Sequence, residues 1–305
     1  MRYTNMSDLP EFVVNFLSAN DYPDHGWYTI GVTSLIDSPR IRRLSLEQPD
    51  LLKDEVMRRV DSAIGSAVHT AVAKADNTGI TEQRFSAKVK HGKRYIKISG
   101  QPDKVIGDVL YDIKTSKATS AIYGIKPHWI QQTNVYRWLL HRNDIDVNSI
   151  KIVAIYKDWS IGEKRRMENS GYTYPAEPIS VINIPVWDME STHDYVMGRV
   201  DAHMALELPE CTFDERWARA SKYAIQKGSK YRAERVLDTL EEAYEWADYN
   251  NIYLEGVVDG RSADIKGYYI SRRPEVWARC ANYCPVSEWC EQWNSFNTTP
   301  ALPEE

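Results

Sequence analysis

Three charged residues in the middle of the chain have the types and the spacing needed to hydrolyse a phosphodiester bond. Asp112 and Lys114 are two residues apart on a predicted strand, so their side chains should leave the same face. Asp103 ends the preceding predicted strand, and a hairpin between the two strands would bring its carboxylate beside Asp112. Two carboxylates and one ammonium group would then share a small patch.

Such a patch suits metal-assisted cleavage. Carboxylate oxygens are the hard ligands that Mg²⁺ and Mn²⁺ prefer, and a bound metal acidifies its coordinated water. A neighbouring lysine can orient that water or stabilise the negative charge that develops on the phosphate. The alternative is a surface salt bridge between Asp112 and Lys114, because Asp-x-Lys is common by chance.

The elements that must position these residues predict an α/β fold. Apolar residues at three- and four-residue steps predict a helix over Leu51–Ala75, and Tyr28–Leu35 is expected to be extended. Further strands are predicted at Thr81–Lys90, Arg94–Asp103, Val109–Ser116, Ser149–Tyr156 and Pro178–Pro185, and further helices at Pro127–His141 and Met189–Leu206. This order favours a mixed central sheet flanked by helices.

The bulk composition is that of a globular protein. The chain has 305 residues, of which 43% are hydrophobic and 27% are charged. A net charge of −5 argues against a protein that coats nucleic acid, but it allows an enzyme with one basic groove. No apolar run is long enough to span a bilayer, and no signal sequence is evident. We therefore expect a cytoplasmic protein with no membrane partner.

Four short motifs, in a coherent order, resemble the PD-(D/E)XK nuclease superfamily and, within it, the RecB-like branch. They are Gly65-Ser66-Ala67-Val68-His69, Gly100-Gln101-Pro102-Asp103, Asp112-Ile113-Lys114-Thr115 and Gln132-x-x-x-Tyr136. That branch includes phage RecB-like exonucleases and the nuclease of CRISPR adaptation. Each motif is weak alone, whereas all four together are specific. The resemblance implies a restriction-endonuclease-like core.

The resemblance also implies roles for individual residues. Asp103 and Asp112 would be metal ligands, and the carbonyl group of Ile113 would be a third oxygen ligand. Lys114 would act on the attacking water. His69 would be a further metal ligand or a DNA contact at the cleft. The residues alone equally allow His69 to be a core histidine on an apolar helix.

Three further residues match the family less specifically. Glu82, at the start of a predicted strand, resembles an acidic position that can join the metal site, although an exposed Glu there is common. Gln132 and Tyr136 are four residues apart on one helical face, and the family uses this pair to brace the centre and touch the substrate. The alternative is a solvent-facing Gln and a half-buried Tyr. Gly65, one turn before His69, is expected to allow a close approach of another backbone.

The cysteines form a second candidate site. Cys280, Cys284 and Cys290 lie close in sequence, and Cys211 is available as a fourth ligand. Four thiolates suit a [4Fe–4S] cluster or a tetrahedral Zn²⁺ site. The RecB-like resemblance favours the iron–sulfur cluster, in a structural role. Two departures from the family are a three-residue gap after Cys280 and Ser38 in Ser38-Pro39-Arg40, where an early cysteine is common.

Basic residues are concentrated in the first predicted hairpin. Contacts to the nucleic acid are predicted for Lys88, Lys90, Lys93 and Arg94. A second, sparser basic run extends from Lys222 to Arg235 and includes Tyr223 and Tyr231. A solvated face is the alternative interpretation of each run.

Together these features predict an N-terminal leader (1–28), a nuclease core (29–207) and a C-terminal region (208–305). The expected function is that of a Mg²⁺- or Mn²⁺-dependent DNA exonuclease in recombination, repair or phage DNA metabolism. A structure-selective endonuclease or nickase, and a non-catalytic DNA-binding assembly subunit, remain as alternatives. The chain has no Walker-type motif, so unwinding would need a helicase or a single-strand-binding recombination partner.

Overall fold

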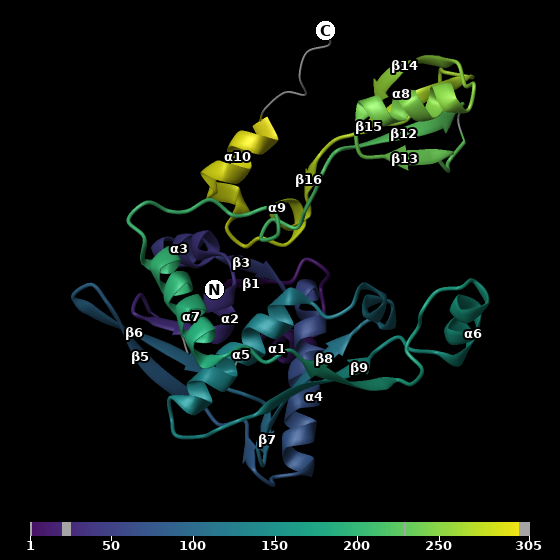
Figure 1. Cartoon of the computed structure of the whole chain (residues 1–305). Helices are drawn as coiled ribbons and strands as arrows, with labels where there is room; N and C mark the ends of the chain where they lie inside the picture. The colour runs from purple at the N-terminus through teal and green to yellow at the C-terminus, as the bar shows by residue number, and fades with distance from the viewer. Residues whose placement is uncertain (1, 20–25, 229, 299–305) are drawn as a thin grey trace. The chain divides into compact units, whose positions relative to one another are not determined.

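The computed structural model describes residues 2–19, 26–228 and 230–298 (Figure 1). The chain divides into two compact units, Met1–Pro209 and Glu210–Glu305. Parts of the predicted leader (residue 1 and 20–25) and of the predicted C-terminal region (229 and 299–305) lie outside the described residues.

The first unit is built on a mixed five-stranded sheet. Its order is β10-β9-β8-β7-β4, and only β8 and β9 are parallel neighbours. The strands are β4 (Ile80–Thr81), β7 (Lys104–Ile106), β8 (Val109–Ser116), β9 (Ser149–Tyr156) and β10 (Ile179–Ile184). Alternate residues of β9 are buried, as a period of two requires. The mixed α/β architecture expected from the sequence is confirmed.

A second sheet of three strands lies in the same unit. Its order is β2 (Thr29–Gly31), β6 (Arg94–Gly100) and β5 (Phe85–His91). The prediction of one strand over Arg94–Asp103 is therefore wrong, because β6 ends at Gly100 and β7 begins in the other sheet. Pro102 has no N–H group and cannot continue a ladder of hydrogen bonds. Asp103 consequently lies where the chain passes from one sheet to the next.

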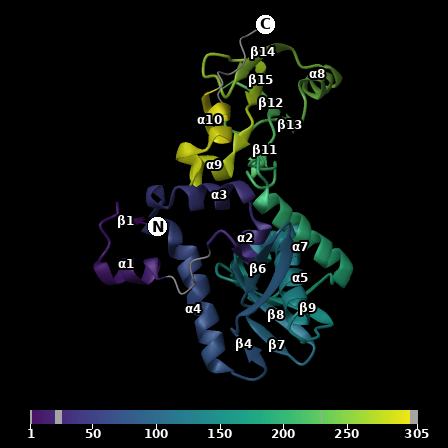
Figure 2. The same cartoon turned by 90° about the vertical axis from the view of Figure 1, so that its left-hand side faces the viewer.

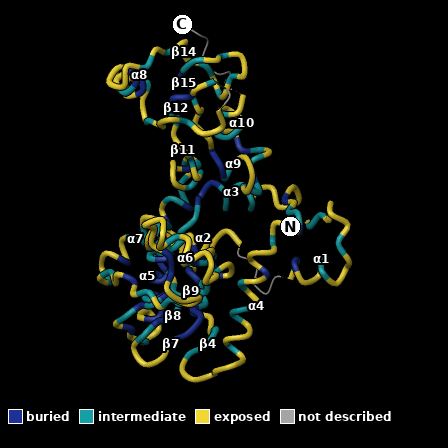
Figure 3. The backbone as a smooth tube through the Cα atoms, turned by 90° about the vertical axis from the view of Figure 1, so that its right-hand side faces the viewer, coloured by how far each residue is buried: buried dark blue, intermediate teal, exposed yellow. Residues whose placement is uncertain are grey.

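Helices α5 (Pro127–His141) and α7 (Met189–Met204) lie side by side (Figure 1 and Figure 2). Proline begins α5, where its missing N–H costs nothing. Figure 3 shows buried backbone along α5, β8 and β9. The extended conformation predicted for Tyr28–Leu35 continues only as far as Gly31, because α2 begins at the next residue. The same unit also contains α2 (Val32–Ile36), α3 (Pro39–Glu47) and α6 (Ile161–Asn169), with 3₁₀ turns at Pro49–Leu51 and Ala118–Tyr123.

The long helix predicted over Leu51–Ala75 is wrong in its first part. That part contains β3 (Lys53–Glu55), which pairs with β1 (Arg2–Thr4), and a 3₁₀ turn at Val56–Arg59; α4 is Val60–Ala75. Ala63 is the buried residue of α4, whereas Val60 and Ile64 are each 37% exposed. The apolar spacing predicted the helix correctly. The face that this spacing assigns to the core, however, is mostly not covered by other described residues. Helix α1 (Glu11–Ser18) packs Leu17 against Val56 and Ala63.

The second unit contains a four-stranded sheet with helix α8 (Leu240–Tyr249) on one face (Figure 1). The sheet order is β13 (Arg235–Leu237), β12 (Lys222–Lys227), β15 (Tyr268–Arg273) and β14 (Leu254–Asp259). Thr239 and Glu242 form the capping box that their spacing predicts. The rest of this unit comprises β11 (Ala218–Arg219), β16 (Val276–Trp277), α9 (Ala278–Asn282), a 3₁₀ turn at Ser287–Trp289 and α10 (Glu291–Thr298).

In the part of the chain that is described, no helix is both long and apolar enough to cross a bilayer.

Candidate active site and metal centre

Asp103 is the residue around which the site is built. Its Oδ2 atom accepts a hydrogen bond of 2.6 Å from the backbone N–H of Ile113 on β8. Lys104 pairs with Tyr111 in the β7–β8 hairpin, so the register places Asp103 opposite Asp112. The two carboxylates are therefore neighbours, as the sequence predicts, although the hairpin that joins them begins at β7.

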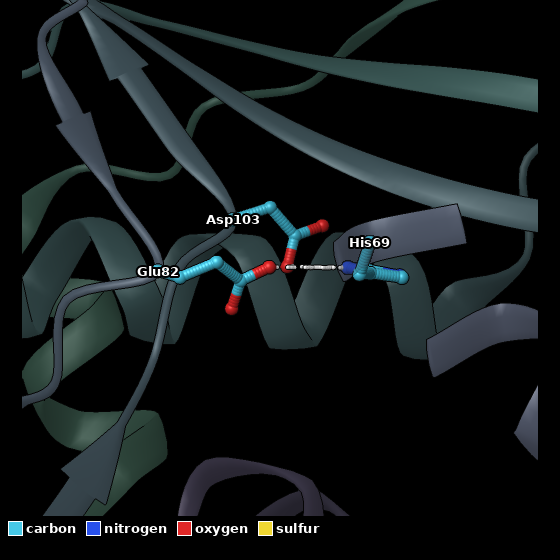
Figure 4. Close-up of side chains that lie close together, drawn as sticks. All are labelled: His69, Glu82 and Asp103. Carbon is cyan, nitrogen blue, oxygen red and sulfur yellow. Dashed lines mark ion pairs between the residues drawn. The ribbon is translucent and has the colours of Figure 1, made fainter. Parts of the chain in front are cut away.

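The other oxygen of Asp103 and the carboxylate of Glu82 both face the His69 ring (Figure 4). The Nδ1 atom of His69, on α4, lies 3.1 Å from Asp103 Oδ1 and 3.6 Å from Glu82 Oε1. One ligand atom from each residue lies within 4.8 Å of the others. His69 is thus no core histidine, because its side chain is 27% exposed and faces two carboxylates.

Glu82 reaches this centre from a strained backbone. It lies between β4 and β5 rather than at a strand start, with a left-handed φ of 49° that non-glycine residues rarely adopt. Its N–H donates to the carbonyl oxygen of Asp103 over 3.1 Å. The bend is therefore held beside Asp103, and strain of this kind is concentrated at functional sites.

The electrostatics of the three groups are those of a site that binds a cation. The hydrogen bond to Asp103, and then the one to Glu82, raise the pKa of His69 to about 10 against the effect of burial. Burial acts to raise the pKa of Glu82, but hydrogen bonds from His69 and Gln101 outweigh it and the pKa is lowered. The Glu82 carboxylate is thus stabilised as an anion by the neighbouring positive charge of His69.

The donor atoms also have a suitable spacing for a divalent metal. Octahedral ligands about 2.1 Å from a metal lie about 3 Å from their neighbours and about 4 Å from the opposite ligand. The separations of 3.1 and 3.6 Å from His69 Nδ1 fall in this range. Carboxylate oxygens with one imidazole nitrogen are compatible with Mn²⁺ and Mg²⁺. The residues present therefore fit a divalent cation.

Asp112 and Lys114 form a buried pair on β8. Lys114 Nζ lies 2.8 Å from Asp112 Oδ2, and the Asp112 side chain is only 2% exposed. Asp112 Oδ2 is buried, yet among the described residues no donor, including Lys114, is oriented to make a hydrogen bond to it. Burial raises the pKa of Asp112 to about 6; the charge of Lys114 opposes this shift and that of Asp103 adds to it. The alternative of a surface salt bridge is wrong, and a poorly satisfied buried carboxylate is a further feature expected of a metal ligand.

Helix α5 positions Lys114 from the other side. Lys114 Nζ donates to Gln132 Oε1 over 2.8 Å, and Gln132 Nε2 donates to the hydroxyl oxygen of Tyr136 over 3.0 Å. Tyr136 is 7% exposed. Gly100 allows this packing, because a Cβ atom there would lie 2.8 Å from both the Tyr136 ring and Leu139. Gln132 is therefore fixed by hydrogen bonds to Lys114 and Tyr136, unlike the solvent-facing side chain of the alternative interpretation.

Comparison with known families identifies this arrangement. The family model described as the PD-(D/E)XK nuclease superfamily matches residues 40–291. The chain belongs to this superfamily. It is accordingly a nuclease, with a restriction-endonuclease-like fold and a requirement for divalent metal that the acidic centre can meet.

Solved structures resemble the nuclease only distantly. The protein SSO0001 is 20% identical, with a TM-score of 0.44, over 62% of this chain and 84% of that one. An alkaline exonuclease from Laribacter hongkongensis is 12% identical, with a TM-score of 0.30, over 59% and 90%. A phage related exonuclease from Haemophilus somnus is 12% identical, with a TM-score of 0.24, over 63% and 76%. No curated protein matches the chain.

The sequence did not reveal the residues that hold Glu82. Gln101 Nε2 donates to Glu82 Oε2 over 2.8 Å, and Arg84 Nη2 donates to Gln101 Oε1 over 2.8 Å. Gln101 could have been suspected from its place in the motif of Asp103, but nothing in the sequence links Arg84 to it.

Gly65 does not have the predicted role. A Cβ atom there would lie 3.6 Å from Thr115 Oγ1, which is an ordinary contact. Helix α4 does approach β8 at this point, but not closely enough to require glycine.

The predicted nucleic-acid contacts lie on the β5–β6 hairpin of the nuclease, on two faces. Lys88 is paired with Lys97 and Lys90 with Tyr95, and all four are exposed. This face continues through the Ser86–Ser99 pair toward Arg84 and Gln101 beside the metal centre. Lys93 lies in the turn. Arg94 is on the opposite face and stacks on the Tyr28 ring at 4.9 Å.

The four cysteines lie near one another within the second unit. Gln292 on α10 accepts a hydrogen bond from Cys211 N over 2.8 Å and donates to Cys211 O over 3.1 Å. Burial, and then the neighbouring thiolates of Cys284, Cys211 and Cys290, raise the pKa of Cys280 to about 11. Like-charged thiolates so arranged favour the thiol form until a metal neutralises them. Ser38 has another role, as the N-cap of α3.

The hydrogen bonds from Arg84 to Gln101 and from Gln101 to Glu82, here called the brace, can be tested by mutation. Replacing Arg84 with Leu should free Gln101, loosen Glu82 and weaken metal binding, because groups that orient metal ligands typically contribute 10–100-fold in affinity. We expect the Mn²⁺ concentration for half-maximal cleavage of single-stranded DNA to rise at least about fivefold. The rate at saturating Mn²⁺ should stay within about twofold, since Arg84 does not contact Lys114 or Asp112. Arg165→Leu on α6 is the matched control, and an equal Mn²⁺ requirement in both variants would refute the brace.

Proposed function

We propose that the protein is a Mg²⁺- or Mn²⁺-dependent deoxyribonuclease of the RecB-like branch, acting as an exonuclease on DNA ends or single strands. The observation that carries the proposal is the convergence of Asp103 and Glu82 on His69 Nδ1, while the other oxygen of Asp103 is tied to β8 beside Asp112. A centre of this kind is suited to hydrolysis of phosphodiesters.

Four side chains would hold the metal. These are His69, Glu82, Asp103 and Asp112, with the Ile113 carbonyl as a proposed fifth ligand. When bound, the divalent cation supplies an acidified water and neutralises charge on the phosphate. Asp103 fixes the geometry, because one of its oxygens is held by Ile113 N while the other faces His69. The strained bend at Glu82 and the Arg84–Gln101 brace set the angle of the remaining carboxylate.

Lys114 is placed to act on the attacking water. Its ammonium group has three N–H donors. One is directed to Gln132 Oε1, and the group is held close to Asp112 Oδ2. A remaining N–H can donate to the attacking water or to a phosphate oxygen. Tyr136 holds Gln132, and so sets the position of the lysine through one intermediate side chain.

Lys88, Lys90 and Lys97 form a row of exposed lysines on one face of the β5–β6 hairpin. This lysine row supports a nucleic-acid substrate that approaches along β5 and β6. Like charges directly across a strand pair are destabilising, so the pairing of Lys88 with Lys97 has a cost in the free protein. A phosphate backbone along this face would relieve that repulsion. Tyr95, 64% exposed beside the row, offers a surface on which a base can stack.

The exonuclease mode and the pathway rest on the resemblance of the four motifs to RecB-like exonucleases. We place the activity in recombination, repair or phage DNA metabolism, with unwinding supplied by a separate helicase or single-strand-binding partner. The bulk charge of −5 agrees with an enzyme that grips DNA locally rather than coating it.

Cleavage of defined DNA substrates tests the proposal. The protein should degrade end-labelled linear DNA with Mn²⁺ and leave a covalently closed circular strand intact. Lys114→Ala should lower the rate about 10²- to 10³-fold, the usual effect of removing a group that stabilises transition-state charge. Lys74→Ala, an exposed lysine on α4, should cleave like the wild type.

The remaining outcomes of that assay discriminate the alternatives. Cleavage of the closed circle would replace the exonuclease by an endonuclease or nickase. DNA binding without Mn²⁺-dependent cleavage would indicate an assembly subunit. Equal rates in wild type and Lys114→Ala would refute the assigned catalytic centre.

For the C-terminal region we propose a structural [4Fe–4S] cluster held by Cys211, Cys280, Cys284 and Cys290. The segment around the cysteines has few buried apolar residues of its own, chiefly Trp277, Ala278 and Val286, so a metal cluster would stabilise it. Zn²⁺ is the alternative occupant of four thiolates.

Metal analysis of anaerobically purified protein tests this assignment. We expect about four iron atoms and four sulfides per chain, and a brown colour. Cys211→Ser should lose iron, whereas Ser38→Ala, at the position where the family often has a cysteine, should retain it. Stoichiometric zinc would overturn the cluster, and full iron in Cys211→Ser would overturn the fourth ligand.

A further inference from the structure

The second unit has a pocket whose lining is dominated by arginine. Its volume is about 560 Å³, and it is lined by Tyr231, Arg232, Ala233, Glu234, Arg235, Val236 and Arg273. Three of these side chains carry guanidinium groups and only one is acidic. The acidic one, Glu234, is already paired with Lys230 at 3.2 Å.

The three guanidinium groups of the pocket are not neutralised by the described residues. With the described residues, the side chains of Arg232, Arg235 and Arg273 form neither ion pairs nor hydrogen bonds. Nearby basic side chains are neutralised by ion pairs: Arg272 pairs with Asp259, and Lys222 pairs with Asp238. Unpaired guanidinium groups gathered in a pocket are suited to phosphate, whose oxygens accept two parallel N–H bonds from each fork.

Four exposed acidic residues of this unit lie together on helix α8, which covers one face of the sheet. Helix α8 packs on the sheet through Ala243, which contacts Ile225 and Ile270. Its exposed acidic residues are Glu241, Glu242, Glu245 and Asp248.

The pocket extends to the other face of the sheet. Leu237 packs toward α8, so alternation places Val236 on the opposite face, and the same holds for Arg273 relative to Ile270. Arg235 lies on β13, an edge strand of the sheet. A polyanion can therefore approach Arg273 from the side that α8 does not cover, whereas Arg235, opposite Ile225 on the α8 side, lines the pocket at the edge of the sheet.

An aromatic ring accompanies the arginines. Tyr231 is 85% exposed, and the Arg261 guanidinium lies 4.8 Å from the centre of its ring. An exposed tyrosine next to cationic groups is the combination with which proteins bind single-stranded nucleic acid, because bases stack on the ring while cations follow the backbone.

We propose that this pocket is a second DNA-binding site, in which Arg232, Arg235 and Arg273 bind phosphates of a single strand and Tyr231 stacks on a base. The choice of DNA as the polymer rests on the proposed function. The site itself rests on the pocket, its unpaired arginines and the exposed tyrosine. Such a site would hold the substrate strand independently of the metal centre.

Binding of a fluorescent oligothymidylate in EDTA tests this site without cleavage. In the triple variant Arg232→Gln, Arg235→Gln, Arg273→Gln, the slope of log Kd against log salt should fall by about 2, because each phosphate contact on a single strand contributes about 0.7. Affinity at low salt should fall at least about tenfold. Tyr231→Ala should weaken binding and leave the slope unchanged.

The matched control removes the same charge elsewhere. Lys164→Gln, Arg165→Gln, Arg166→Gln on α6 should change affinity less than about twofold and leave the slope nearly constant. Replacing the three pocket arginines by lysine should restore the slope but not the full affinity, since lysine lacks the bidentate fork. The single variant Arg273→Gln provides the same test, with a smaller change, should the triple variant unfold.

Two results would overturn the proposal. The first is a pocket variant that binds like the α6 control. The second is competition by thymidine monophosphate at the same phosphate concentration as the oligonucleotide, which would indicate a mononucleotide site. Binding in EDTA is measured without cleavage, so the result does not depend on the metal centre. A failure of the proposed nuclease activity is thereby separated from a failure of this site.

Discussion

The hydrogen bond from Ile113 N to Asp103 Oδ2 is the interaction on which the site depends. Pro102 ends β6, and the chain then turns into a second sheet with Asp103 at the crossing. The 2.6 Å bond ties that carboxylate to β8 directly beside Asp112. Because one oxygen is committed in this way, the other faces His69, and the backbone carbonyl of Asp103 holds the bend that carries Glu82. Four segments distant in sequence thus meet at a single side chain.

The charges of the site explain why it needs a cation. Two neighbouring carboxylates, one of them almost fully buried, repel each other and lose hydration. In the protein alone, His69 and Lys114 supply the compensating positive charge. A divalent metal can replace the proton on His69 and leave Lys114 to act on the substrate. The same principle applies to the cysteines, because neighbouring thiolates disfavour the charged form of Cys280 in the absence of a metal.

The parts of the fold that follow from local patterns were predictable. The spacing of apolar residues and Pro127 defined α5, alternation defined β9, and the motifs around Asp103 and Asp112 indicated the site. Contacts between distant segments were not predictable. Arg84 reaches Glu82 only through Gln101, and the left-handed bend at Glu82 is imposed by its bond to Asp103. Helix α4 has the apolar period of a core helix although few of its residues are covered, so the pattern predicted the element but not its burial.

Calorimetric titration with Mn²⁺ in the absence of DNA tests the central claim most directly. We expect saturable binding by the wild type and at least about tenfold weaker binding by Asp103→Asn, whose two oxygens organise the whole centre. Lys114→Ala should bind Mn²⁺ at least as tightly as the wild type, because it removes a cation that competes for Asp112. Equal Mn²⁺ affinity in the wild type and Asp103→Asn would contradict the account.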